Sequence, residues 1–226
     1  MSPSNDFISP KEMYAIENNC ETMGISRLLL MENAASSVVN HLKLKFKELS
    51  LLKIVIISGK GNNGGDGFAL ARHLSGYNSD VTVILVGDSA DIKTNEAKIN
   101  YNIIKQIKKI TRIELNDSSN INIVKSHVEN ADLIIDAIFG TGLTRKIKNL
   151  HSIILDLVNS SNAYTLSLDV PSGLNSFTGG INGNYVNADE TITFHKMKKG
   201  LINNPNLSCE VHLMKIGIPI EAESLS

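Results

Sequence analysis

The sequence predicts an α/β protein whose central sheet is mostly parallel and covered by helices on both faces. Two observations support this prediction. Short apolar segments rich in β-branched residues alternate with amphipathic segments of helical length along the 226 residues. Three of the apolar segments also run directly into loops that are rich in glycine and polar residues. Such alternation is typical of βαβ units, in which helices connect parallel strands.

The N-terminal region predicts two helices between residues 9 and 46. Ser9 and Pro10 suit a helix cap and a first turn, and Gly24 separates the two helices. Ser26 then precedes a set of apolar residues at helical spacing. This set consists of Leu28, Leu29, Met31, Ala35, Val38, Val39 and Leu42.

The remaining elements follow in alternation. The segment KIVIIS, residues 53–58, predicts a buried strand, and a helix from about Asp66 to Leu74 follows its glycine loop. Further strands are expected at 80–87, 111–115, 189–195 and 209–217. The segment 131–142 is expected to be a strand that enters a second glycine loop, and 164–173 a strand that ends in a turn. Helices are expected at 95–108, 121–130 and 150–161. No repeat, linker or change of composition divides the chain, so residues 1–226 are expected to form one domain, with 176–188 as a loop.

Composition and charge exclude several classes of protein. The net charge of −1 removes the electrostatic basis for binding nucleic acid or anionic membranes. The longest apolar runs are too short to cross a bilayer, and the N-terminus does not resemble a secretory signal. The two cysteines, Cys20 and Cys209, are expected to be free thiols. We therefore expect a cytoplasmic protein with neither a nucleic-acid nor a membrane partner.

Three loops carry the candidate chemistry. The first is Asn62-Asn63-Gly64-Gly65-Asp66-Gly67, the second contains Asp136 and Gly140-Thr141-Gly142, and the third is Asp169-Val170-Pro171-Ser172-Gly173. Because each follows a strand of a parallel sheet, all three should meet at the same edge, where ligands bind in open α/β folds. Their carboxylate, amide and hydroxyl oxygens suit a hard cation better than a transition metal.

The first loop leaves two interpretations open. Gly59, Gly61 and Gly64 match the dinucleotide fingerprint G-x-G-x-x-G, and Asp88 stands where a ribose-binding acid is expected. These features favour an NAD-dependent dehydrogenase. Asp66, however, would place a carboxylate near the pyrophosphate. The asparagines and free N–H groups at a helix start would also cradle a phosphate or hydroxyl group. A simple strand-to-helix turn with Asp66 as cap remains an alternative.

Several motifs together resemble the NAD(P)H-hydrate epimerase family, also called the YjeF N-terminal domain family. These motifs are LLLMENAA, GKGNNGGDGFALARHL, DAIFGTGL, SLDVPSGLNSFTG and TITFHKMKKGL, and the resemblance runs from about Ile8 to Ile218. It implies a Rossmann-like three-layer α/β/α sandwich that forms a homodimer. It further implies an epimerase that interconverts the R and S forms of the hydrated cofactors NADHX and NADPHX in nicotinamide nucleotide repair. A separate ATP- or ADP-dependent dehydratase then repairs the S form.

The resemblance also implies site residues. The substrate-binding residues are Asn62, Asn63, Gly64, Gly65, Asp66, Gly140, Thr141, Gly142, Leu143, Thr144, Arg145, Lys146 and Asp169. One potassium ion per subunit is implied, with Asn63, Asp136 and Ser172 as its ligands. Asp169 is the candidate catalytic residue, because epimerisation by loss and return of water, or by ring opening, needs a group that donates and accepts a proton.

The chain departs from the family pattern at three positions, where Lys60, Ala35 and Lys199 replace proline, glycine and proline. None of these changes removes a polar group from the proposed site. His73 and His195 are expected to be structural, and Lys196, Lys198 and Lys199 to be solvated. Besides the dehydrogenase, a non-catalytic binding or scaffold protein of the same fold is an alternative, although such proteins tend to lose the asparagine-glycine loop and the site aspartates.

Overall fold

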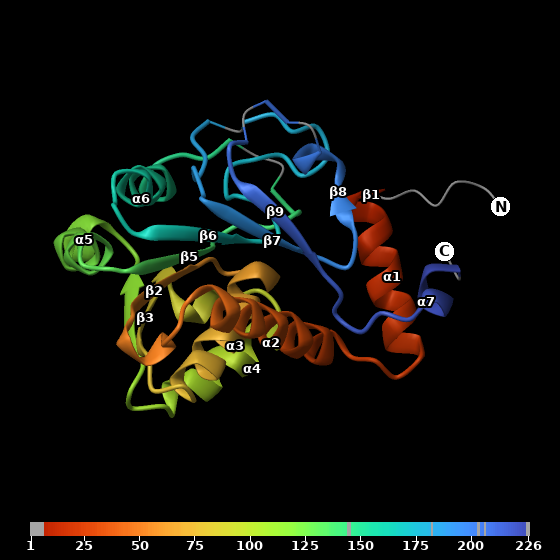
Figure 1. Cartoon of the computed structure of the whole chain (residues 1–226), viewed down its shortest axis with the longest axis horizontal. Helices are drawn as coiled ribbons and strands as arrows, with labels where there is room; N and C mark the ends of the chain where they lie inside the picture. The colour runs from red at the N-terminus through yellow and green to blue at the C-terminus, as the bar shows by residue number, and fades with distance from the viewer. Residues whose placement is uncertain (1–6, 144–145, 182, 203, 206, 225–226) are drawn as a thin grey trace.

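The structure is a computed structural model that describes residues 7–143, 146–181, 183–202, 204–205 and 207–224. Its centre is a seven-stranded sheet in the order β4-β3-β2-β5-β6-β7-β9, in which every pair of neighbours is parallel (Figure 1). The strands are β2 (Lys53–Ser58), β3 (Asp80–Val86), β4 (Thr111–Leu115), β5 (Leu133–Ala137), β6 (Tyr164–Leu168), β7 (Glu190–Phe194) and β9 (Glu210–Met214). Two further short strands, β1 (Phe7–Ile8) and β8 (Met197–Lys198), pair with each other.

Helices cover both faces of the sheet. The helices α2, α3 and α4 lie against one face, and α5 and α6 lie against the other, while α1 and α7 pack together near β8 (Figure 1). Their bounds are α1 (Pro10–Thr22), α2 (Arg27–Lys45), α3 (Asn62–Ser75), α4 (Asn95–Lys105), α5 (Ile121–Glu129), α6 (Leu150–Asn159) and α7 (Ile220–Ser224). Short 3₁₀ turns lie at Leu49–Leu51, Ser89–Asp91, Ser118–Asn120 and Lys199–Leu201. The predicted three-layer α/β/α class is therefore confirmed.

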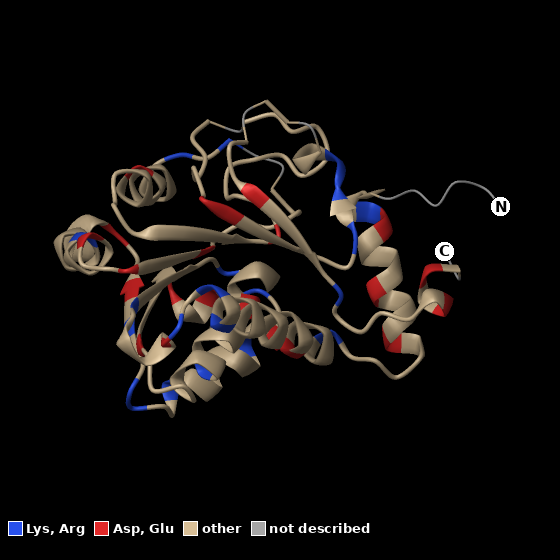
Figure 2. Ribbon diagram, viewed as in Figure 1, with Lys and Arg blue, Asp and Glu red and all other residues tan. Residues whose placement is uncertain are grey.

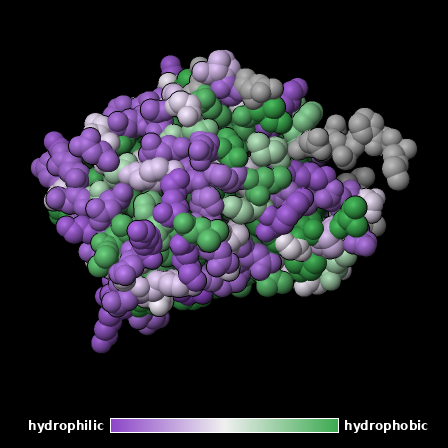
Figure 3. Space-filling model, in the orientation of Figure 1, coloured by the Kyte–Doolittle hydropathy of each residue, from purple (hydrophilic) through white to green (hydrophobic). Residues whose placement is uncertain are grey.

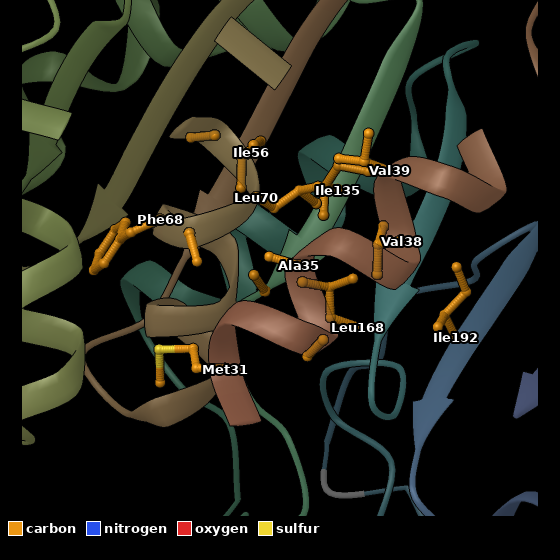
Figure 4. Packing of buried hydrophobic residues seen from close by; sticks show 14 of the residues in the cluster. Met31, Ala35, Val38, Val39, Ile56, Phe68, Leu70, Ile135, Leu168 and Ile192 are labelled. Carbon is orange, nitrogen blue, oxygen red and sulfur yellow. The ribbon is translucent and has the colours of Figure 1, made fainter. Parts of the chain in front are cut away.

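Strand β2 explains why the central strands are apolar on both faces. Ile54 and Ile56 belong to the core beneath α2 and α3, whereas Val55 and Ile57 belong to the core beneath α5 and α6. A strand that is buried on both faces cannot alternate apolar and polar residues, which accounts for the continuous run KIVIIS. Figure 4 shows the first of these cores, where side chains of the sheet, Ile56, Ile135, Leu168 and Ile192, pack with α2 and α3.

The helix after the first glycine loop begins earlier than the sequence predicts. We expected it near Asp66, but α3 starts at Asn62, so the loop residues form its first turn. The glycines make this possible. A Cβ at Gly59 would lie 2.1 Å from the Ile138 carbonyl oxygen, and a Cβ at Gly64 would lie 1.9 Å from the Gly59 carbonyl oxygen. The helix therefore starts directly against the chain that leaves β2, where no side chain fits.

The order of the strands places the three polar loops at one position. From β2 the chain continues through β3 to β4 on one side, and β5, β6 and β7 follow on the other side. The order therefore reverses between β2 and β5, which is where open α/β sheets bind ligands beyond the carboxyl ends of their strands. The predicted convergence of the three loops at one edge is confirmed.

Strands β2 and β4 have the predicted bounds, most other predicted elements are shorter than predicted, and β1, β8 and α7 were not predicted. Helix α4, for example, ends at Lys105 rather than Lys108. The face of the molecule in Figure 3 is mostly hydrophilic, with apolar residues in separate groups. Among the described residues, no helix is both long and apolar enough to traverse a bilayer.

Candidate active site

Asn63 brings an unpaired polar side chain to the start of α3. It is the second residue of the helix and is only 8% exposed. Neither its amide oxygen nor its amide nitrogen has a hydrogen-bond partner among the described residues. A buried amide without partners costs about 1–3 kcal/mol, so such a group points to a ligand that satisfies it. The helix cap, Gly61, offers no side-chain hydrogen bond either, so the first N–H groups of α3 remain available to a ligand.

Asp136 is a buried carboxylate whose hydrogen bonds are complete. It is the penultimate residue of β5 and is fully buried. Its Oδ2 accepts from Ser167 Oγ at 2.8 Å and from the Ser172 amide at 2.7 Å, and its Oδ1 accepts from Ser172 Oγ at 2.5 Å and from the Ile138 amide at 3.2 Å. Burial raises the pKa of this carboxyl, and the four donors oppose that rise. Asp136 thereby ties β5, β6 and the loop after β6 together.

Asp169 occupies a strained turn at the end of β6. Its φ of 69° lies in the left-handed region, and the Val170 amide donates to the Leu168 carbonyl across it at 2.9 Å. This three-residue turn is rare for a residue other than glycine. The turn directs the carboxylate toward the β5 loop, where Asp169 Oδ2 accepts from the Thr141 amide at 3.2 Å. Strain of this kind is retained where the surrounding structure needs the side chain in one position.

Gly140 is the point at which the first and third loops meet. A Cβ at this glycine would lie 3.0 Å from Asp169 Oδ2 and 3.4 Å from the side chain of Asn63. On the other side, the amide of the preceding residue, Phe139, donates to Ser172 Oγ at 2.9 Å. The loop after β5 is therefore held between Ser172 and Asp169, and the structure brings Asn63 and Asp169 together beside it.

Lys198 is a site residue that the sequence analysis assigned wrongly. We expected a solvated lysine, but Lys198 is only 1% exposed. Its Nζ lies 2.6 Å from Asp169 Oδ1 and donates to the Phe194 carbonyl at 2.8 Å. Nothing in the run of three lysines distinguishes it from its neighbours, because its burial depends on the pairing of β8 with β1. The only available signal was its position in the segment TITFHKMKKGL that carries the family resemblance.

Asp66 adds a second acid to the same region. Burial raises its pKa well above the ordinary value, and the negative charges of Asp169 and Glu17 raise it further. Lys198 acts in the opposite direction but does not outweigh them. Glu17, on α1, was not predicted as a neighbour of the site, and burial raises the pKa of its carboxyl although Arg27 lies 3.3 Å away. The site therefore holds two acids with different environments: Asp66, which forms no salt bridge among the described residues, and Asp169, which pairs with Lys198.

The oxygen atoms near the loop after β5 are of the chemical type that binds potassium ions. Asn63 offers an unpaired amide oxygen, and Ser172 Oγ lies 3.3 Å from the Phe139 carbonyl oxygen. Such neutral and anionic oxygens are the donors that hard cations prefer. Asp136 fits this role less directly, because four donors already use its carboxylate oxygens. Its part would be to orient Ser172.

For the other predicted substrate residues that the structure describes, there is no hydrogen bond to the side chain of Asn63 or Asp169. Asn62 and Gly142 are exposed, whereas Gly64, Gly65 and Leu143 are buried. Lys146 is exposed and lies against Gly183 in the 176–188 loop. Thr144 and Arg145 lie outside the described residues. A hollow of about 470 Å³ is lined by Phe7, Phe177, Thr178, Lys199 and Ile202, none of which is a predicted site residue.

The two histidines that we expected to be structural lie outside this cluster. His73 pairs with Glu32 on α2 at 2.8 Å. His195 follows β7 in a turn like that of Asp169, with φ of 67°, and is 1% exposed. Burial lowers the pKa of its imidazole to about 4, so it is neutral at physiological pH.

Comparisons with known proteins identify related sequences. Residues 27–200 match the model of the family described as YjeF-related protein N-terminus. The chain is 38% identical over 216 residues to an NAD(P)H-hydrate epimerase of Nitrosopumilus maritimus, covering 96% of this chain and 97% of that protein. It is 37% identical to the enzyme of the same name from Cenarchaeum symbiosum, with the same coverage.

A third relative is longer. The chain is 37% identical over 220 residues to a bifunctional NAD(P)H-hydrate repair enzyme Nnr of Hyperthermus butylicus, covering 96% of this chain but 39% of that enzyme. Among solved structures, the yeast protein ynu0 superposes with a TM-score of 0.71 at 22% sequence identity, over 86% of this chain and 82% of that one. At this level of identity the superposition supports the fold alone.

Proposed function

The chain belongs to the family of YjeF-related protein N-termini, and we propose that it is an NAD(P)H-hydrate epimerase. In this proposal it interconverts the R and S forms of NADHX and NADPHX. The observation that carries the proposal is the meeting of the unpaired Asn63 amide and the Asp169 carboxylate beside Gly140, at the reversal point of the sheet. An amide would orient the nicotinamide, and a carboxylate would exchange a proton with its hydroxyl group.

The two acids suggest a division of roles. In the substrate, the carbon that carries the hydroxyl is bonded to the ring nitrogen. A proton transferred to that hydroxyl lets it leave as water, and the nitrogen electron pair stabilises the resulting cation. A water molecule then adds to the other face and gives up a proton. Asp66, with its raised pKa, suits the donor, and Asp169, paired with Lys198, suits the acceptor. Reversible ring opening is the alternative route and uses the same groups.

The names of the relatives favour this function over the two alternatives. A dehydrogenase would need a substrate that exchanges hydride with the cofactor, and a scaffold would not need the asparagine-glycine loop or the site aspartates. The reported relatives are named epimerases or hydrate repair enzymes. The loop and both aspartates are retained in this chain.

A coupled assay tests the epimerase proposal. Purified R-NADHX is incubated with an S-specific dehydratase and the ATP or ADP that the dehydratase needs. Recovery of NADH is followed by its absorbance. We expect this protein to accelerate recovery beyond spontaneous epimerisation, in proportion to its concentration. Recovery at the rate of the dehydratase alone would contradict the proposal. A parallel incubation with NAD and candidate alcohols tests the dehydrogenase.

We further propose that one potassium ion binds beside Asn63 and Ser172, with Asp136 orienting the serine. When bound, the ion would offset the negative charge of Asp66, Asp136 and Asp169. Replacing K⁺ by tetramethylammonium at constant ionic strength should lower both the epimerisation rate and the midpoint of thermal unfolding. Asn63→Leu should abolish the response to K⁺. Equal rates and equal midpoints in the two salts would contradict the potassium proposal but not the epimerase proposal.

The remaining expectations concern assembly. We propose that residues 1–226 act as one catalytic domain in the cytoplasm, as a homodimer that works with a separate dehydratase. The family resemblance supports the homodimer. The name and greater length of the bifunctional relative support a link between epimerase and dehydratase activities. Size-exclusion chromatography with light scattering distinguishes a dimer from a monomer.

A further inference from the structure

A second cluster of polar side chains lies on the far end of the sheet from the candidate active site. Glu190 is the first residue of β7, so it stands at the opposite end of that strand from Phe194, whose carbonyl accepts from Lys198. Four residues of a strand span roughly 13 Å. In Figure 2, acidic residues colour the starts of β7 and β9 at this end. The Glu190 carboxylate is fully buried.

Two histidines from different elements converge on one oxygen of Glu190. His41 Nε2, from α2, lies 2.6 Å from Glu190 Oε1, and His212 Nε2, from the edge strand β9, lies 2.8 Å from the same oxygen. The two imidazole rings are 4.8 Å apart between their centroids. A carboxylate and two histidines, with their ligand atoms all within 4.8 Å of one another, form a set that could hold a metal ion.

The second oxygen of Glu190 is occupied by other groups. Tyr164 donates its hydroxyl to Oε2 at 3.0 Å, and Lys45 Nζ lies 3.4 Å from the same atom. These contacts fix the carboxylate and leave Oε1 facing the histidines. A buried carboxylate oxygen that lies within 2.8 Å of two imidazole nitrogens is placed to bind a cation together with them.

His212 is the member of the cluster whose ring nitrogen lacks a hydrogen bond in the described part of the chain. Its Nε2 is buried and lacks an aligned hydrogen bond among the described residues, although Glu190 Oε1 is 2.8 Å away. The nitrogen therefore points past the oxygen rather than at it. Glu210 Oε2 lies 3.5 Å from the same nitrogen, and its side chain is 74% exposed. In a bound state, either the Glu210 carboxylate or a water molecule would supply the fourth ligand.

We propose that His41, Glu190 and His212 form a binding site for a transition-metal ion of the Zn²⁺ type. Two histidine nitrogens and one carboxylate oxygen are a donor set that Zn²⁺ uses in proteins. Ligands at about 2.0–2.1 Å from a tetrahedral ion are about 3.3 Å apart, so modest rotation of the side chains would admit the ion. Because the ligands come from α2, β7 and β9, the ion would fasten the edge strand and a covering helix to the sheet. The site is separate from the epimerisation chemistry.

The test uses the untagged full-length protein, treated with a chelator and dialysed. Zinc sulfate is titrated into it by isothermal calorimetry. We expect one equivalent to bind, and thermal unfolding with Zn²⁺ to move to higher temperature. His41→Ala and His212→Ala should each weaken the affinity by at least about tenfold. The control is His127→Ala on α5, whose ring lies near Thr82 instead of the cluster; it should bind as the wild type does.

Spectroscopy with Co²⁺ supplies a second readout that does not depend on folding energetics. A bound Co²⁺ ion in the cluster should give visible absorption bands that His212→Ala removes and His127→Ala retains. Epimerase activity of His212→Ala should equal that of the wild type. No stoichiometric binding of Zn²⁺, or binding that persists in both cluster variants, overturns the proposal and leaves a charge cluster in which the histidines pair with Glu190 alone.

Discussion

The ends of β5 and β6 each carry an aspartate, and the two differ in what surrounds them. Asp136 is fully buried and accepts four hydrogen bonds, so every one of its acceptor positions is used. Asp169 is held in a strained turn and paired to Lys198, and it lies beside the Asn63 side-chain amide, which has no hydrogen-bond partner in the described part of the chain. A carboxylate with complete hydrogen bonds organises the fold. One with spare acceptor capacity next to an unsatisfied group is available to a substrate.

The largest expected effect is that of Asp169→Asn on catalysis. The amide has nearly the shape of the carboxylate but cannot accept the proton, and such groups contribute about 10²–10⁴-fold to rate. We expect the epimerisation rate to fall by this factor, and the thermal midpoint to fall as well because the buried Lys198 loses its charged partner, although the Phe194 carbonyl still accepts from it. The coupled assay and a thermal unfolding curve measure the two quantities. Full activity in a folded variant would show that Asp169 is only a turn residue.

Asp136→Ala should show the opposite pattern, with its main effect on stability. The change leaves the hydroxyls of Ser167 and Ser172 and the backbone amides of Ile138 and Ser172 without their acceptor. The expected cost is about 3 kcal/mol or more in the free energy of unfolding. Urea unfolding measures this cost. The matched control is Asp80→Ala, at the exposed start of β3, which should stay within about 0.5 kcal/mol of the wild type. Equal stability of the two variants would remove the distinction between the two aspartates.

Lys198→Met tests whether the buried lysine supports Asp169. The substitution keeps an apolar stem of similar length but leaves the Asp169 carboxylate without its charged partner. We expect kcat/KM to fall by at least about tenfold. Lys199→Met is the control, because Lys199 is exposed and lies 5.1 Å from the Phe177 ring centre. If the two variants lose activity equally, the ion pair has no special part in the reaction.

The smallest effect is expected from the pH dependence of stability at Asp66. Its pKa is raised in the folded protein, so the folded state holds the proton while the unfolded state releases it. Stability therefore falls as pH rises from about 3.8 through the raised folded pKa, and stays lower above it. Asp66→Asn removes this loss, and its thermal midpoint should exceed that of the wild type by an amount that grows over the same pH range.

At neutral pH the variant should therefore unfold at a higher temperature than the wild type, and its epimerase activity should be lower. Thermal scans of both proteins at several pH values measure the difference. A variant that is less stable than the wild type at neutral pH would show that the ionised Asp66 carboxylate stabilises the fold.

The sequence predicted the features that depend on local pattern. Apolar runs gave the strands of the sheet, and because parallel strands share one direction, their polar ends had to gather at one edge. The start of α3 was misplaced because a helix beginning with glycines looks like a loop. The burial of Lys198 depends on the pairing of β8 with β1, which no local pattern encodes. The cluster of His41, Glu190 and His212 likewise depends on the tertiary fold, because His41 on α2 and Glu190 on β7 are 149 positions apart in the sequence.

The most direct test of the account is a crystal structure of the Asp169→Asn variant with bound NADHX. The account predicts that the hydrated nicotinamide ring lies beside Gly140, with its amide at Asn63 and its hydroxyl group within hydrogen-bond distance of residue 169. A ring bound elsewhere, for example in the hollow lined by Phe177 and Ile202, would contradict the assignment of the active site.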